Sequence, residues 1–300
     1  MKKTNIVLIT AGIIIIVLGV YFFTKKSPEA VPVAQNPEVI ATTTKTAVEK
    51  PVDKTKIVLG ASIEKRDIVA YHYGTGAKEL LFVGGIHGGY EWNTSLLAYE
   101  LMDYLKANPT VIPANIKVTV IPVLNPDGLN KVVRTTDRFT EADVSPSKDV
   151  VISGRFNANK VDLSRNFDCK WQSKGVWMET TVSGGANAFS EPESQAFKNY
   201  VEKNSPVAVV VWYSSAGGVF SSSCEDGILP ETKALTTAYA SASGYKAYDS
   251  YDFYETTGDI VSWLAKKNIP AISVLLTTHQ DTEWNKNLAG VKAMFTRYTK

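Results

Sequence analysis

The sequence predicts an α/β fold, an α/β/α sandwich in which helices cover both faces of a mostly parallel or mixed β-sheet. Apolar runs with the character of strands alternate along the chain with segments of helical periodicity, as is typical of such sandwiches. The run PVAVVVWYSS at 206–215 is continuously apolar, which indicates a central strand covered on both faces. The chain has 300 residues, which is long enough to bury a large core.

The expected strands, in chain order, lie at 66–74, 79–87, 115–128, 206–215 and 269–278. The expected helices lie at 91–108, 190–204, 230–244, 258–268 and 282–300. In the second helix Ser190 stands three residues before Glu193, the spacing of a capping box. The segment NPDG, at 125–128, has the composition of a turn that closes a strand. Ligands bind beyond the carboxyl ends of strands in such sheets, so functional residues are expected just after strands.

The N-terminal segment has the composition of a membrane anchor. Pairs of lysines flank an almost wholly apolar run over 6–23, and about 20 apolar residues cross a bilayer core. A cleaved signal peptide is the alternative, but the segment 25–35 offers only a poor small-x-small cleavage site. The sequence therefore predicts one transmembrane helix within 1–26, a polar tether over 27–55, and a folded domain over 56–300 outside the cytoplasm.

Composition excludes some functions and leaves others open. The net charge is only +2 and no long basic stripe is present, which argues against binding to nucleic acid. The only cysteines are Cys169 and Cys224. An even count in an extracytoplasmic protein permits a disulfide, and two buried thiols are the alternative.

The segment GGIHGGYEWNT, at 84–94, follows an expected strand and opens an expected helix. His87 and Glu91 could face one point, and imidazole and carboxylate are normal zinc ligands. A helix cap and a surface charge are the alternative for these two residues. The remaining histidines, His72 and His279, are interpreted as structural residues and not as relocated ligands.

Four further segments follow in order: VLNPDGLN at 123–130, GRFNANKVDLSRNFD at 154–168, AFSEPESQAF at 188–197, and the stretch from 254 to 274. Together with GGIHGGYEWNT they resemble the zinc carboxypeptidases of the carboxypeptidase A type. The resemblance covers nearly all of the folded body. It implies a mixed, largely eight-stranded sheet, a single zinc at its carboxyl end, hydrolysis of C-terminal peptide bonds, and peptide substrates with a free C-terminal carboxylate.

The resemblance assigns the first two zinc ligands to His87 and Glu91. The familiar spacing places the glutamate three residues after the histidine, and Tyr90 stands there instead. The extra residue is expected to be absorbed by the neighbouring glycines.

Further roles carry over to other positions. Arg155 resembles the arginine that polarises the scissile carbonyl, a role suited to a fixed guanidinium, with a surface salt bridge as the alternative. Arg165 resembles the arginine that binds the substrate's terminal carboxylate, with an ion pair to Asp162 or Asp168 as the alternative. Tyr254 resembles the mobile tyrosine that closes over substrate.

Several positions depart from the family pattern. Ser164 replaces an asparagine that shares the substrate carboxylate. The third zinc ligand, a histidine in the family, falls on Ser214, or on Tyr213 if the register shifts by one residue. The general-base glutamate falls on Leu275, or on Leu276 in the other register. Leucine cannot transfer a proton, and a catalytic zinc normally has three protein ligands, so weak or absent zinc is expected.

Four hypotheses follow. The first is a membrane-anchored member of this family with impaired or lost hydrolysis and a retained cleft for peptide C-termini. The second is an active metallocarboxypeptidase with an altered site that cleaves peptides or cell-wall peptide stems. The third is an engineered knockout of an active parent, and the fourth is a structural ectodomain. Asp259 lies near the expected side-chain pocket, where it could favour basic C-terminal residues or simply cap a helix.

Overall fold

The computed structural model describes residues 55–300. The expected anchor over 1–26 and nearly all of the tether over 27–55 lie outside the described residues. Within 55–300, no helix is both long and apolar enough to span a bilayer. The described chain belongs to one compact unit, Val52–Lys300.

The eight strands of the main sheet are ordered β1-β2-β4-β3-β7-β10-β8-β9, and a separate hairpin consists of β5 and β6. The sheet is mixed: β4, β3, β7 and β10 run parallel, whereas β1 with β2, β2 with β4, and β10 with β8 are antiparallel. This confirms the expected mixed, eight-stranded sheet. The strands are β1 (Lys56–Ala61), β2 (Asp67–Tyr73), β3 (Lys78–Val83), β4 (Ile116–Ile121), β5 (Lys174–Trp177), β6 (Thr180–Ser183), β7 (Ala208–Ser214), β8 (Gly218–Ser221), β9 (Lys246–Tyr248) and β10 (Ala271–Leu276).

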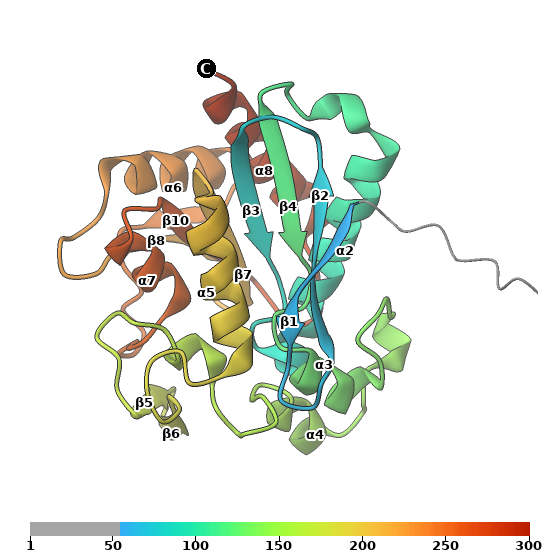
Figure 1. Ribbon diagram of the computed structural model, residues 1–300, viewed down its shortest axis with the longest axis vertical. Coiled ribbons are helices and arrows are strands. Elements are labelled where there is room, and N and C mark those ends of the chain that lie inside the picture. Colours follow the sequence, from blue (N-terminus) through green and yellow to red (C-terminus); the bar gives the residue numbers. More distant parts are fainter. Residues whose placement is uncertain (1–54) are drawn as a thin grey trace, which may run out of the picture. The chain divides into compact units, whose positions relative to one another are not determined.

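Helices pack on both faces of the sheet (Figure 1). On one face lie α2, α6 and α8, and on the other lie α5 and α7. The helices are α2 (Trp92–Ala107), α3 (Pro126–Val133), α4 (Lys148–Ser153), α5 (Pro192–Asn204), α6 (Pro230–Ser243), α7 (Ile260–Lys266) and α8 (Trp284–Thr299), together with short 3₁₀ turns that include η1 (Gly88–Glu91) and η4 (Leu163–Arg165).

The strand β7 is the centre of the core, as its continuous apolar run predicts. All of its residues are buried. Val210 and Trp212 pack with α2, α6 and α8, whereas Val209, Val211 and Tyr213 pack with α5 and α7. Side chains alternate between the faces of a strand, so a strand covered on both faces needs an unbroken apolar run.

Two helix starts differ from the expectation. The helix α5 begins at Pro192 with Glu191 as its N-cap residue, so the capping box expected at Ser190 is wrong. Proline is favoured in the first turn of a helix, and here it sets the start. The segment NPDG begins the helix α3, because the Asn125 side chain accepts a hydrogen bond from the Gly128 amide.

Candidate functional site

A cavity of about 950 Å³ opens beyond the carboxyl ends of β3, β7 and β10. It brings together every position expected to bind metal, bind substrate or act in catalysis: His87, Glu91, Arg155, Ser164, Arg165, Ser214, Tyr254 and Leu275. These residues come from segments far apart in the sequence. Their convergence agrees with the rule that ligands of α/β sheets bind at this edge.

The turn η1 brings His87 and Glu91 together. His87 Nδ1 lies 2.8 Å from Glu91 Oε1, and both side chains are buried. Gly88 has a positive φ of 46°, and a Cβ atom there would lie 2.6 Å from the Gly154 carbonyl oxygen. Only glycine fits at this position of the turn.

Asp162 lies behind this pair and holds Arg155. The Arg155 Nε atom donates a hydrogen bond of 2.9 Å to Asp162 Oδ2, and His87 Nε2 lies 3.4 Å from Asp162 Oδ1. Burial alone would raise the pKa of Asp162, but the Arg155 guanidinium and His87 hold it well below its usual range. Arg155 is only 1 % exposed, so a buried ion pair replaces the surface salt bridge considered as its alternative role.

The Nδ1 atom of His87 has two competing neighbours. Arg155 Nη1 lies 3.1 Å away and can only donate, whereas Glu91 Oε1, when ionised, can only accept. One nitrogen cannot satisfy both. A protonated Nδ1 could donate to Glu91, whereas an unprotonated Nδ1 could accept from Arg155. His87 Nδ1 therefore lies between a donor, Arg155, and an acceptor, Glu91.

Tyr213 packs beside His87. Its ring centroid lies 5.3 Å from that of His87, and its hydroxyl donates to Asp259 Oδ1 at 3.2 Å. Burial, with the Asp259 and Glu91 carboxylates, raises the pKa of the Tyr213 phenol well above its ordinary value. A phenol that keeps its proton is not a normal zinc ligand.

The neighbouring Ser214 faces a different group of residues. Its hydroxyl lies 3.1 Å from Asn93 Oδ1 and 2.9 Å from His279 Nδ1. In the register of the parallel pair, Tyr213 lies opposite Leu275 and Ser214 opposite Leu276. Leu275 lines the cavity, whereas Leu276 packs in the core with α2, α6 and α8.

Arg165 makes hydrogen bonds to uncharged oxygens. Its Nη1 donates to the carbonyl and hydroxyl oxygens of Ser164, at 3.0 and 3.1 Å, and Nη2 donates to the Val176 carbonyl at 3.0 Å. Its Nε is buried and has no partner among residues 55–300. The Tyr254 ring lies 5.8 Å from its Cζ atom. The ion pair with Asp162 or Asp168 is therefore not what holds this arginine; Asp168 pairs with Lys266.

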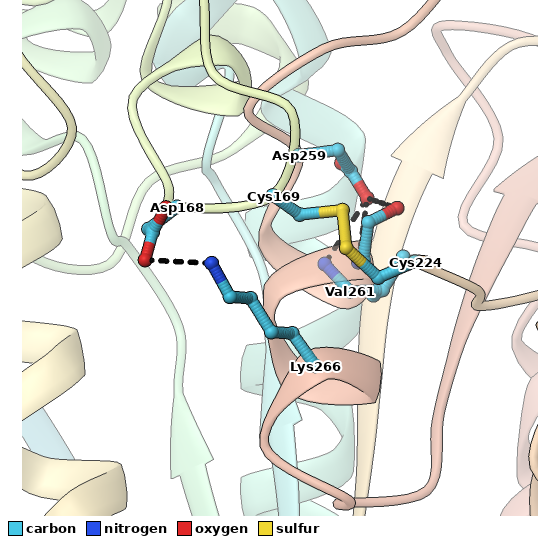
Figure 2. Close-up of a disulfide and its surroundings, with 7 residues drawn as sticks. Asp168, Cys169, Cys224, Asp259, Val261 and Lys266 are labelled. Atoms are coloured by element: carbon cyan, nitrogen blue, oxygen red, sulfur yellow. Dashed lines mark hydrogen bonds and ion pairs between the residues drawn. A yellow bond between two sulfur atoms is a disulfide. The ribbon is translucent and has the colours of Figure 1, made fainter. Parts of the chain in front are cut away.

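The disulfide between Cys169 and Cys224 closes one side of the cavity. The two Cα atoms are 6.1 Å apart, so the alternative of two free thiols is wrong. Figure 2 shows the disulfide beside Asp259 and the first turn of α7. Asp259 caps this helix, because its Oδ2 accepts hydrogen bonds of 3.1 Å from the amides of Val261 and Ser262.

The residues present do not form a complete site for catalytic zinc. Within 55–300, no group of three or more His, Cys, Asp or Glu side chains could hold a metal ion. His87 and Glu91 could supply two ligands, but the neighbouring Tyr213 donates its hydroxyl to Asp259, and its phenol pKa is raised well above the ordinary value. Because the usual centre has three protein ligands, the donor set does not fit one.

Comparison with known proteins identifies the family. The model of the zinc carboxypeptidase family matches residues 40–298. The chain belongs to the zinc carboxypeptidase family. The match extends over nearly the whole described domain and confirms the resemblance inferred from the motifs.

Curated relatives match part of this zinc carboxypeptidase homologue. A zinc carboxypeptidase from Simulium vittatum is 29 % identical over 174 residues, which is 55 % of each chain. The gamma-D-glutamyl-L-diamino acid endopeptidase 1 of Lysinibacillus sphaericus is 24 % identical over 216 residues, which is 65 % of this chain and 54 % of that protein. The chain thus spans about half the length of these relatives.

Solved structures support the fold. The murein-tripeptide amidase MpaA from Escherichia coli O157 aligns with a TM-score of 0.57 and 20 % identity, over 81 % of this chain and 91 % of that one. At this identity the likeness shows the shared fold alone.

Proposed function

We propose that this zinc carboxypeptidase homologue binds peptides by their free C-terminal carboxylate, and that its zinc-dependent hydrolysis is impaired or lost. The observation that carries the proposal is the contrast within one cavity. The arginine suited to the carboxylate is present and lines the cavity, whereas the positions for the third ligand and the base hold Tyr213 and Leu275.

The proposed binding of C-terminal carboxylates rests on Arg165. This guanidinium lines the cavity, has no carboxylate among its hydrogen-bond partners, and has a buried Nε without a partner in the described chain. A guanidinium fork binds a carboxylate bidentately. Ser164 contributes a hydroxyl beside it, which is a shorter group than the family's asparagine.

The proposed loss of hydrolysis rests on Tyr213 and Leu275. The pairing of Tyr213 with Leu275 supports Tyr213, and not Ser214, as the residue in the third-ligand position. Leu275 cannot take a proton from water, and a general base is worth about 10²–10⁴-fold in rate. With a tyrosine and a leucine at these two positions, the third zinc ligand and the carboxylate base of the family's zinc-dependent reaction are both missing.

The test is a calorimetric titration of the full-length chain with a short peptide that bears a free C-terminus. The same peptide with an amidated C-terminus is the comparison. Arg165→Gln should weaken binding of the free peptide by about 10–100-fold, because a charge-assisted hydrogen bond is worth about 1.5–3 kcal/mol. Arg138→Gln, outside the cavity, is the matched control. Equal affinity for both peptides would overturn the binding proposal, and chelator-sensitive release of C-terminal residues would favour an active peptidase.

We also propose that residues 1–26 anchor the chain as a single-pass protein, with the domain outside the cytoplasm. The flanked apolar run over 6–23 supports this, as does the disulfide, since disulfides persist in oxidising compartments. Deletion of 1–26 should move the protein from the membrane fraction to the soluble fraction. Retention in the membrane fraction would contradict the proposal.

A further inference from the structure

A chain of hydrogen-bonded polar side chains lies at the edge of the cavity, beside the ring of Tyr90. It runs from Asn93 through Ser214 and His279 to Ser215. Ser214 Oγ lies 3.1 Å from Asn93 Oδ1 and 2.9 Å from His279 Nδ1, and Ser215 Oγ lies 3.5 Å from His279 Nε2. The proposed peptide-binding function does not use any of these contacts.

The direction of the hydrogen bonds follows from Asn93. Its Nδ2 donates to the carbonyl oxygens of Thr278 and Asp281, at 2.8 and 3.0 Å, so the amide oxygen faces Ser214. An amide oxygen can only accept, so the Ser214 hydroxyl gives its proton to Asn93. His279 Nδ1 must then donate to Ser214 Oγ. This arrangement satisfies every group and fixes the tautomer of His279.

With Nδ1 protonated, the lone pair of His279 is on Nε2 and faces the hydroxyl of Ser215. Ser215 is exposed and lines the cavity. The Tyr90 ring, whose centroid is 4.7 Å from that of the imidazole, packs against His279. Burial lowers the pKa of His279, against the opposing effect of the Glu91 carboxylate. In the absence of substrate, contacts between a nucleophile and its base are often long, and 3.5 Å is within that pattern.

We propose that Ser215 is a nucleophile and His279 its general base, in a metal-independent acyl-transfer site for carboxylic esters. Ser214 and Asn93 act as positioning residues, because they set the tautomer of the base. The arrangement of nucleophile, base and orienting group is the one on which serine hydrolases rely.

The reaction balances without any further reagent. Ser215 Oγ forms a bond to the ester carbonyl carbon while its proton passes to His279 Nε2. The bond from that carbon to the alcohol oxygen breaks, and the alcohol leaves with the proton from His279. Water then attacks the acyl-serine, giving its proton to Nε2, and the released Ser215 oxygen takes the proton back.

The test is labelling of the full-length chain with a fluorophosphonate, followed by mass-spectrometric mapping of the modified residue. Ser215 displaces fluoride from phosphorus and loses its proton to His279. We expect one labelled site at Ser215, unaffected by chelator. Ser215→Ala should abolish labelling, and His279→Gln should slow it by about 10²–10⁴-fold. Ser223→Ala is the matched control, since Ser223 lines the same cavity outside the polar chain.

Two substitutions of Ser214 test its positioning role separately from its contribution to folding. Ser214→Ala should slow labelling at Ser215, whereas Ser214→Thr, which keeps the hydroxyl, should restore the rate. Labelling that spreads evenly over Ser215 and Ser223, or a rate that is unchanged in His279→Gln, would overturn the proposal. Peptide binding through Arg165 is measured independently, so failure of one proposal is distinguishable from failure of the other.

Discussion

Arg155 and Asp162 form a buried ion pair at the centre of the site, with both Nε and Nη2 of the arginine 2.9 Å from Asp162 Oδ2. The other carboxylate oxygen of Asp162 accepts hydrogen bonds from the amide and hydroxyl of Ser164 and faces His87. The Asp162 carboxylate thus connects Arg155 to the turn η4, which carries Arg165. The position of Arg165, the proposed carboxylate-binding residue, therefore depends on the contacts of Asp162.

Arg155→Gln should lower the free energy of unfolding by about 3–5 kcal/mol, because it leaves the Asp162 charge buried without its partner. Arg138→Gln is the matched control. Arg138 pairs with Asp103, but their side chains are 51 % and 62 % exposed, so the loss should be at most about 1 kcal/mol. Urea unfolding of the three proteins measures the difference. Equal losses in the two variants would show that Arg155 is not part of a buried pair.

The free energy of unfolding should fall in acid as Asp162 becomes protonated. Its folded pKa lies below that of an unfolded aspartate, about 3.9. The stability it contributes is therefore complete above about pH 3.9 and is lost as the pH falls through the folded pKa. Urea unfolding at a series of pH values between about 5 and 3 measures this loss. In Asp162→Asn that part of the pH dependence should flatten, and an unchanged slope would contradict the role given to Asp162.

Removal of the disulfide should destabilise the domain. The bridge closes a loop with a sequence separation of 55, for which chain entropy gives about 4 kcal/mol. The double variant Cys169→Ser, Cys224→Ser should show this loss in denaturant unfolding. The same loss should appear when the parent chain is unfolded under reducing conditions. If reduction left the unfolding midpoint unchanged, the bridge would not constrain the chain.

Much of the fold could be predicted from the sequence because its strands are buried on both faces. β7 is apolar up to Ser214, β3 is apolar after Lys78 and Glu79, and β10 is apolar apart from Ser273. The hairpin of β5 and β6 was not predicted, since its strands are short, polar and mostly exposed. The helix α3 was not expected because Asn-Pro before Asp-Gly fits both a turn and a helix start.

The site was predicted as a set of residues but not as a set of contacts. The motifs named Arg155 and Arg165, yet they did not show that Asp162 pairs with Arg155. The interaction of Ser214 with His279 joins positions 65 residues apart, which no local pattern indicates. The choice between Tyr213 and Ser214 depended on strand register, since neighbouring residues of a strand point to opposite faces.

The register itself predicts which substitutions rebuild a metal site. Tyr213→His with Leu275→Glu should tighten zinc binding and raise hydrolysis of C-terminal residues by about 10²–10⁴-fold, because it supplies a third ligand and a base. Ser214→His with Leu275→Glu is the matched control and should do neither. Zinc affinity and peptide hydrolysis are measured for both pairs. A gain confined to Ser214→His with Leu275→Glu would assign the third-ligand position to Ser214 and not to Tyr213.

Metal analysis of the full-length chain is the most direct measurement. The protein is loaded with equimolar zinc, freed of loosely bound metal by gel filtration, and assayed for zinc and for peptide hydrolysis. Two ligands without a third predict zinc far below one ion per chain, and no hydrolysis that a chelator abolishes. Zinc retained at close to one ion per chain, with hydrolysis that stops on chelation and returns with zinc, would contradict the account.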